Sequence, residues 1–173
     1  MTFEKATIND LKKIKEIYKL AQNHMINENN TTQWVNHEDV FAKDIINYIN
    51  KQCFYIAKSE DEIVGFFAMI YGIDKTYNEI KEGKWLNENP YVTIHKIAVK
   101  YYGQKIAQNI LEFIINDAIN NNVYNIRIDT HKNNKSMKRF LEKNDFIKCG
   151  IISITNSFED INSLREAYLN QIK

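Results

Sequence analysis

The sequence has few of the residues that bend, loosen or cross-link a chain. Of its 173 residues, one is proline, five are glycine and two are cysteine. Cys53 and Cys149 lie far apart and form neither a metal-binding nor a redox spacing, which favours a reducing compartment such as the cytoplasm. No apolar run approaches the roughly 18 residues of a membrane span, and the first residues lack a signal-peptide core. We therefore expect a cytoplasmic protein with no membrane partner.

The chain also lacks an excess of either charge. Its 23 Lys and Arg residues nearly balance 22 Asp and Glu residues, which leaves a formal net charge of +1. An extended nucleic-acid interface usually requires a basic imbalance, so we expect no nucleic-acid partner. A hydrophobic fraction of 44% with 12% aromatic residues is typical of a globular protein. Neither a repeat nor a flexible linker divides the chain, so residues 1–173 are predicted to form one domain.

Hydrophobic spacing predicts an α/β fold. Apolar residues recur every three or four positions after Thr7, a candidate N-cap supported by Asp10, and the same period marks three later segments. The predicted helices run from Thr7 through Met25 and over residues 38–49, 104–120 and 134–143. Short apolar runs predict strands over residues 53–58, 63–71, 91–99, 124–129, 147–154 and 165–169. The first two strands form a hairpin, residues 72–90 form an excursion, and the helix 104–120 joins two parallel strands by a crossover.

The loop before the helix 104–120 is a candidate anion site. Gly103 can adopt positive φ, and the free amides at a helix N-terminus suit a phosphate, with charge available from Lys100 and Lys105. Alternatively, Gly103 simply makes a tight turn. Neither G-x-G-x-x-G nor G-x-x-x-x-G-K-[ST] is present, which argues against dinucleotide and nucleoside-triphosphate chemistry.

Two segments resemble the GNAT N-acetyltransferase superfamily. Residues 94–107, Ile-His-Lys-Ile-Ala-Val-Lys-Tyr-Tyr-Gly-Gln-Lys-Ile-Ala, are similar to its acetyl-CoA segment, with the pattern [QR]-x-x-G-x-[GA]. Tyr102 and Lys105 depart from that pattern, whereas the small Ala107 fits it. Residues 134–146 are similar to the family segment N-x-x-A-x-x-x-Y-x-x-x-G-F. The order of the predicted elements also matches over most of the chain.

A narrower bacterial GNAT subgroup is also similar. Its I-H-[RK]-x-A-V, R-[IL]-D-T-H-x-x-N-x-x-M and C-G-I-I motifs correspond to residues 94–99, 127–137 and 149–152. No single motif carries the resemblance, which rests on their order and spacing together. It implies a mixed, mostly antiparallel sheet with helices on both faces and a central strand–helix–strand crossover.

The resemblance further implies an acetyl-CoA cosubstrate, bound in a cleft where the two crossover strands separate. Backbone groups of Ile97 and Val99 would pair with the pantetheine arm, and amides of the loop would hold the pyrophosphate. Lys105, in the place of a glycine, either points outward to the adenosine phosphate or tightens the loop and weakens binding. The expected cofactor-binding residues are Ile97, Ala98, Val99, Tyr102, Gly103, Gln104, Lys105, Ile106, Ala107 and Asn134.

Amine acetylation benefits from a general base, and a histidine with a pKa of about 6.5 suits neutral pH. By a period of two, His95 shares a strand face with Ile97 and Val99, and Asp129 and His131 lie at the end of the next crossover strand. We predict His95, Asp129 and His131 as catalytic candidates. Each has a plainer alternative: a strand histidine paired with a neighbour, or loop capping before Asn134. Asp129, His131 and Asn134 are too few for a metal cage, so no metal is expected.

Three further positions bear on chemistry. Many GNAT enzymes have a tyrosine that acts as general acid where this chain has Leu141. In this chain, a water, Cys149 or a cleft tyrosine would instead protonate the departing CoA thiolate. The resemblance also suggests an oxyanion donor, the Val99 amide at a strand bulge. Trp34 and Trp85 are candidate acceptor-binding residues, although aromatics in such segments more often fill hydrophobic clusters.

The sequence therefore predicts transfer of an acetyl group from acetyl-CoA to a primary amine of a small molecule or peptide. The alternative is a catalytically silent acyl-CoA-binding sensor. Asp74, Glu79, Glu82 and Glu88 could attract a cationic amine. The sequence does not decide between a monomer and a homodimer.

Overall fold

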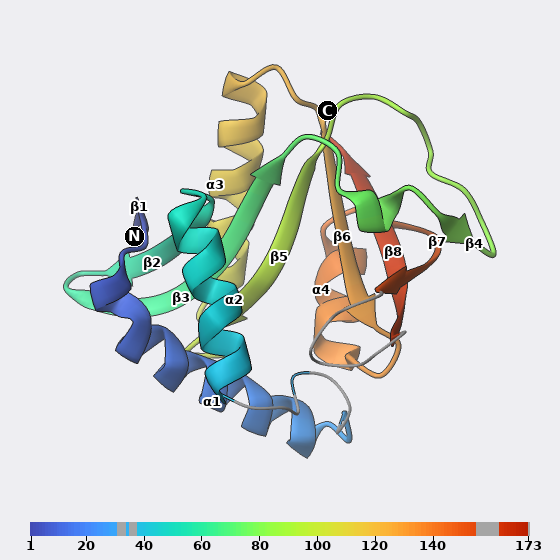
Figure 1. Cartoon of the computed structure of the whole chain (residues 1–173). Coiled ribbons are helices and arrows are strands. Elements are labelled where there is room, and N and C mark those ends of the chain that lie inside the picture. Colours follow the sequence, from blue (N-terminus) through green and yellow to red (C-terminus); the bar gives the residue numbers. More distant parts are fainter. Residues whose placement is uncertain (31–33, 35–37, 155–162, 173) are drawn as a thin grey trace.

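A central mixed sheet organises the molecule (Figure 1). The computed structural model describes residues 1–30, 34, 38–154 and 163–172. Its helices are the short 3-10 turns η1 (Ile8–Asp10) and η2 (Lys75–Tyr77) and the α-helices α1 (Leu11–Asn27), α2 (Glu38–Asn50), α3 (Ile106–Asn120) and α4 (Lys135–Lys143). Its strands are β1 (Thr2–Lys5), β2 (Phe54–Ser59), β3 (Glu62–Tyr71), β4 (Ile80–Lys81), β5 (Val92–Val99), β6 (Asn125–His131), β7 (Ile147–Ile154) and β8 (Ser163–Gln171).

The sheet has the strand order β1-β2-β3-β5-β6-β8-β7-β4. Its pairs are antiparallel except β5 and β6, which run parallel on either side of the α3 crossover. This confirms the mixed, mostly antiparallel α/β fold. The predicted helices and strands are found with ends displaced by a few residues, whereas β1 and the two-residue β4 were not predicted.

Helices α1 and α2 cover one face of the sheet, in front of it in Figure 1. The face of α1 that the sequence predicts, including Ile14, Tyr18 and Met25, packs with Phe41 and Ile45 of α2. These side chains rest on β2, β3 and β5, and Tyr18 stacks on Phe41 with ring centroids 3.6 Å apart. Burial of this apolar stripe holds both helices against the sheet.

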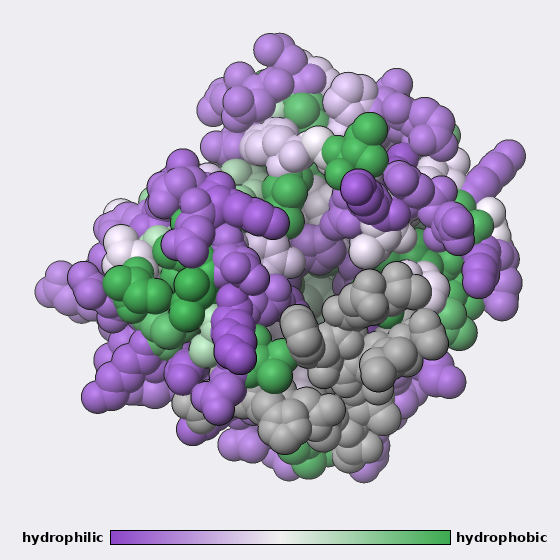
Figure 2. Space-filling model, in the orientation of Figure 1, coloured by the Kyte–Doolittle hydropathy of each residue, from purple (hydrophilic) through white to green (hydrophobic). Residues whose placement is uncertain are grey.

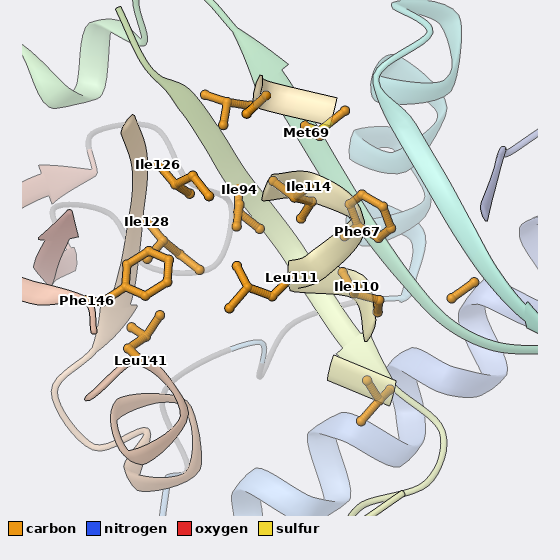
Figure 3. Close-up of a cluster of buried hydrophobic side chains, with 14 of the residues drawn as sticks. Phe67, Met69, Ile94, Ile110, Leu111, Ile114, Ile126, Ile128, Leu141 and Phe146 are labelled. Carbon is orange, nitrogen blue, oxygen red and sulfur yellow. The ribbon is translucent and has the colours of Figure 1, made fainter. Parts of the chain in front are cut away.

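Helices α3 and α4 cover the opposite face, where Figure 3 shows side chains of α3 meeting those of the crossover strands. Ile110 and Ile114 are fully buried against β3, β5 and β6. Gly65 of β3 permits this approach, because a Cβ there would lie 3.0 Å from the Ala98 carbonyl oxygen and 3.2 Å from Ile110 Cδ1. The helix therefore packs directly onto the strands that later separate.

The predicted excursion, extended here by Tyr91 and called the excursion 72–91, contains η2 and β4. Its strand β4 pairs with β7 at the edge of the sheet, while Tyr77, Trp85 and Tyr91 pack against side chains of β7 and β8 on the α1–α2 side. A buried arginine anchors it: the Arg127 guanidinium of β6 lies 4.1 Å from the Trp85 ring centroid and 4.0 Å from that of Tyr91. Arg127 Nη2 also donates to the Asn87 carbonyl oxygen at 2.9 Å. The attraction between the guanidinium and the aromatic faces thus fixes the excursion against β6.

Candidate active site

The crossover strands separate after a short stretch of pairing. β5 and β6 are paired only from Val92 to Ile94 and from Ile126 to Ile128. Directly after β5, the Lys100 amide donates to the Val64 carbonyl oxygen of β3 at 2.7 Å. Because bonding sides alternate along a strand, the polar backbone groups of Ile97 and Val99 face away from β3, toward the gap. These groups are available to an extended ligand.

A bulge in β5 lies beside this gap. Ala68 of β3 faces His95 and Phe66 faces Ala98, so β5 has one residue more than β3 in this interval. Lys96 takes up the irregularity with a φ of 51°, and its ammonium lies 3.1 Å from Asp44 Oδ2 of α2. The bulge is therefore at Lys96 rather than at Val99, the residue to which the sequence analysis assigned it.

The bulge also corrects the expected position of His95. An inserted residue resets the alternation of a strand, so His95 does not share a face with Ile97 and Val99. Those two pack toward the α3 side of the sheet. His95 lies on the opposite face, where the excursion 72–91 covers it.

The loop between β5 and α3 has the backbone of an anion-binding turn. Gly103 has a φ of 79°, and Lys105, the N-cap of α3, is left-handed with φ 59° and ψ 12°. The first bond into the helix is donated by the Asn109 amide to the Lys105 carbonyl oxygen at 2.9 Å. The amides just before it have no partner within the helix and are free for a ligand. Lys105 thus holds the conformation that glycine adopts most easily.

Neighbouring helices fix the same loop. The Tyr102 ring stacks on the His24 ring of α1 with centroids 3.7 Å apart. Burial, followed by the charge of Glu28, raises the pKa of Tyr102 to about 12. Glu28 in turn accepts from the backbone amide and the hydroxyl of Ser136, at the start of α4. The end of α1 therefore joins the loop to the N-terminus of α4.

A cavity of about 1150 Å³ extends through the gap from one face of the sheet to the other. In Figure 2 the face that carries α2 and the excursion is hollowed near its centre. Every predicted cofactor-binding residue except Gln104 lines this cavity. Asn134 lines it while capping α4, where its side-chain oxygen accepts from the Met137 amide at 3.0 Å. The Thr130 hydroxyl is buried in the same wall and has no hydrogen-bond partner in the described structure.

His95 lies between two carboxylates at the other end of the cavity. Its Nε2 is 2.8 Å from Asp74 Oδ2, and its Nδ1 is 3.9 Å from Asp129 Oδ1. Asp129 Oδ1 also accepts from the Tyr77 hydroxyl at 2.7 Å, and Oδ2 lies 3.9 Å from Arg165 Nε. Burial alone would raise the pKa of Asp74, but hydrogen bonds from His95 and Thr76 lower it to about 2. Asp74 is therefore ionised at neutral pH.

Some predicted residues lie elsewhere. His131 is buried outside the cavity lining, where its Nδ1 accepts from the Asn133 amide at 3.2 Å. Trp85 is buried beneath the excursion and donates from Nε1 to the Tyr77 carbonyl oxygen at 2.9 Å. Trp34 does line the cavity, packed against Tyr18. Leu141 and Cys149 are buried away from the lining, in the cores behind and in front of the sheet.

Asp74 was predicted only as a carboxylate that could attract a cationic amine, and Tyr77 had no predicted role. The one local signal for Asp74 is Asp-x-Thr, typical of a side chain that caps a turn. Its Oδ1 does accept from the Thr76 amide and hydroxyl. Nothing local indicates that this turn lies against His95, because the contact depends on how the excursion returns over the sheet. Glu79 and Glu82 are exposed, and the side chain of Glu88 is 87% exposed.

The comparisons with known proteins agree with this architecture. A family model described as "Acetyltransferase (GNAT) family" matches residues 14–146. A GNAT-family acetyltransferase from Streptococcus agalactiae is 26% identical, with a TM-score of 0.83 over 99% of this chain and 95% of that chain. No curated protein matches the sequence.

Two more distant structures share the fold. The YncA protein of Salmonella typhimurium, solved with its cofactor acetyl-CoA, is 14% identical, with a TM-score of 0.65 over 100% of this chain and 94% of that chain. The PaiA N-acetyltransferase of Thermoplasma acidophilum, solved with coenzyme A, is 15% identical, with a TM-score of 0.64 over 99% of each chain.

The fold and the cleft define an acetyltransferase-type α/β domain. The chain belongs to the GNAT acetyltransferase family. Among its described residues, no group of three or more His, Cys, Asp or Glu side chains is placed to hold a metal ion. No helix in the described ranges is both long enough and apolar enough to cross a membrane.

Proposed function

We propose that this protein transfers an acetyl group from acetyl-CoA to a primary amine of a small molecule or peptide. The observation that carries the proposal is one continuous cavity. It joins the separated strands and the free loop amides at one end to His95 and Asp129 at the other. A thioester bound along β5 would meet an amine that enters from the side of α2 and the excursion.

The residues at the cosubstrate end suit acetyl-CoA. Exposed backbone groups of Ile97 and Val99 can pair with the amides of a pantetheine arm, as a further strand would. The α3 N-terminus offers amide donors and a positive dipole to a pyrophosphate. The unpartnered Thr130 hydroxyl supplies another polar contact inside the gap. Acetyl-CoA supplies an activated acyl group, so no nucleophilic Ser or Cys is needed.

The residues at the acceptor end suit an amine. The amine nitrogen attacks the thioester carbonyl carbon, the C–S bond breaks, and the thiolate leaves with the bonding electron pair. The proton lost by the amine passes to His95, with Asp129 beside it as a second acceptor. Leu141 has no hydroxyl that could act as general acid, so the thiolate takes its proton from solvent or from a tyrosine that lines the cavity. A thiolate is a good leaving group near neutral pH, so the C–S bond can break without a dedicated acid.

Release of the CoA thiol from acetyl-CoA across a panel of small and peptide amines tests the proposal. We expect His95→Ala to lower kcat by about 10²-fold or more. Its Kd for acetyl-CoA, measured by calorimetry, should stay the same because His95 lies away from the loop. His131→Ala tests the other histidine predicted as a base. A larger loss of kcat in His131→Ala than in His95→Ala would assign the general base to His131. An unchanged kcat of the wild type across pH 6–9 would also contradict a histidine base.

The same panel tests the silent sensor. Tight acetyl-CoA binding with neither amine acetylation nor even slow thioester hydrolysis would favour the sensor function. The missing hydroxyl at Leu141 is the observation in its support. A turnover that depends on His95 would exclude it.

A further inference from the structure

We propose that Asp74 is the positioning residue for His95, fixing its tautomer so that Nδ1 is the nitrogen that receives the proton of the amine. This inference rests on the proposed function for its kinetic consequences. Its structural part, the state of the His95 ring, can be tested without turnover. No described residue outside the excursion 72–91 provides a comparable contact to Nε2.

Asp74 is held rigidly at the start of η2. Its Oδ1 accepts from the Thr76 amide at 2.9 Å and from the Thr76 hydroxyl at 2.6 Å. Its own amide donates to the Tyr91 hydroxyl at 3.0 Å. Tyr91 is in turn packed against the buried Arg127 guanidinium. Because Thr76 holds Oδ1, the carboxylate has one orientation, in which Oδ2 contacts His95.

The consequence for the imidazole follows from hydrogen-bond chemistry. A neutral histidine carries one N–H, and an ionised carboxylate can only accept. With Asp74 Oδ2 at 2.8 Å, the hydrogen therefore resides on Nε2. Nδ1 is left with its lone pair, and Asp129 Oδ1 lies 3.9 Å from it, too distant for a direct hydrogen bond. An amine nitrogen that lies beside the line joining these two atoms, within hydrogen-bond distance of each, can donate one hydrogen to each.

The other charged and titratable groups around His95 support this arrangement. Tyr77 of η2 directs its hydroxyl to Asp129 and has its ring centroid 6.0 Å from that of His95. Arg165 of β8 faces the second oxygen of Asp129. On the α2 side, Lys96 is paired with Asp44, and Tyr48 lines the cavity with a pKa that burial raises. Among the described residues, Asp129 thus lies near Nδ1, and Asp74 is the carboxylate that faces Nε2.

The direct test is ¹⁵N NMR of the histidine side chains in the full-length protein without acetyl-CoA. We expect the neutral form of His95 to carry its proton on Nε2 in the wild type. In Asp74→Asn the amide can donate to Nε2, so we expect a shift toward the Nδ1–H form. An Nδ1–H tautomer in the wild type, or the same tautomer in both proteins, would overturn the proposal whether or not the enzyme turns over.

The kinetic test follows the pH dependence of kcat. We expect Asp74→Asn to lower kcat by about 10²- to 10⁴-fold, because the wrong tautomer cannot accept the proton. The KM for acetyl-CoA should stay within about twofold, the range expected if the distant loop is intact. Asp74→Glu, which keeps a carboxylate, should recover part of the loss and keep the Nε2–H form.

Asp61→Asn is the matched control, because it makes the same chemical change at an exposed position in the turn between β2 and β3. It should keep the wild-type kcat and pH profile. Equal losses in Asp74→Asn and Asp74→Glu, with an unshifted pH profile, would instead indicate a merely structural role. An inactive wild type with the expected NMR result would refute the proposed function and leave the positioning intact.

Discussion

The left-handed Lys105 allows the backbone of the phosphate loop to be separated from its charge. Lys105→Ala removes the ammonium and keeps a Cβ in the left-handed region, whereas Lys105→Gly removes both the ammonium and the steric conflict. The side chain is exposed and lines the mouth of the cavity. The two variants therefore differ only in backbone strain.

Two magnitudes follow from this position. At an exposed site, one charge near a phosphate contributes on the order of 1 kcal/mol, or about fivefold in affinity. Both variants should therefore bind acetyl-CoA about fivefold more weakly than the wild type. A residue with a Cβ at φ 59° is destabilised by about 1–2 kcal/mol relative to glycine, less about 0.5–1 kcal/mol for the greater freedom of unfolded glycine. Lys105→Gly should therefore be more stable than Lys105→Ala by about 0.5–1 kcal/mol.

Calorimetric titration of acetyl-CoA at low and high salt measures the first effect, and urea unfolding measures the second. The difference in affinity from the wild type should shrink at about 1 M salt, because an exposed charge is screened there. Tighter binding by Lys105→Gly than by the wild type would refute the reasoning. It would mean that the lysine distorts the loop rather than filling a conformation already suited to phosphate.

Three other measurements test the neighbouring assignments. Ala107→Leu places a bulky side chain in the cavity wall on the first turn of α3. A loss of about 1.4 kcal/mol from crowding would weaken acetyl-CoA binding by about tenfold. Equal affinity of the two proteins by calorimetry would show that the pyrophosphate does not bind at this loop. Because the pKa of Asp74 is about 2 in the fold and its ordinary value is 3.8, its stabilisation is complete above about pH 5 and is lost as the pH falls through 2 to about 1. Urea unfolding should show a loss of about 2 kcal/mol over that range that Asp74→Asn lacks, and parallel curves would contradict it. Leu141→Tyr should lower the free energy of unfolding by about 1–3 kcal/mol, because it overpacks a fully buried site. It should bring no gain in kcat. A higher kcat would show that the tyrosine hydroxyl reaches the cavity.

The parts of the fold that depend on local pattern could be predicted from the sequence. The helical spacing from Ile106 to Ala118 indicates α3, and short apolar runs indicate the strands on either side of it. β1 and β4 were missed because each is short and receives its partner from a distant segment. A sequence of four or two residues contains too little periodicity to outweigh the loop alternatives.

The cosubstrate end of the site was more predictable than the acceptor end. Backbone geometry dominates at the loop, so Gly103 and the start of a helix indicate a candidate anion site, although its assignment to acetyl-CoA rests on the resemblance to the GNAT family. At the other end, the face of His95 depends on one residue added at Lys96, which is neither glycine nor asparagine and gives no local sign of positive φ. Asp74 and Tyr77 reach the site through the packing of the excursion on Arg127, a tertiary effect.

The bulge at Lys96 explains how one strand can serve both substrates. Without it, strict alternation would put His95 on the face of Ile97 and Val99, under α3 and away from Asp74. With it, the backbone of Ile97 and Val99 still faces the gap between β5 and β6, while His95 turns to the side open to α2 and the excursion. The ion pair between Lys96 and Asp44 ties this irregularity to α2. In the proposed function, the added residue thus divides β5 into a segment for the thioester arm and a segment for the base that meets the amine.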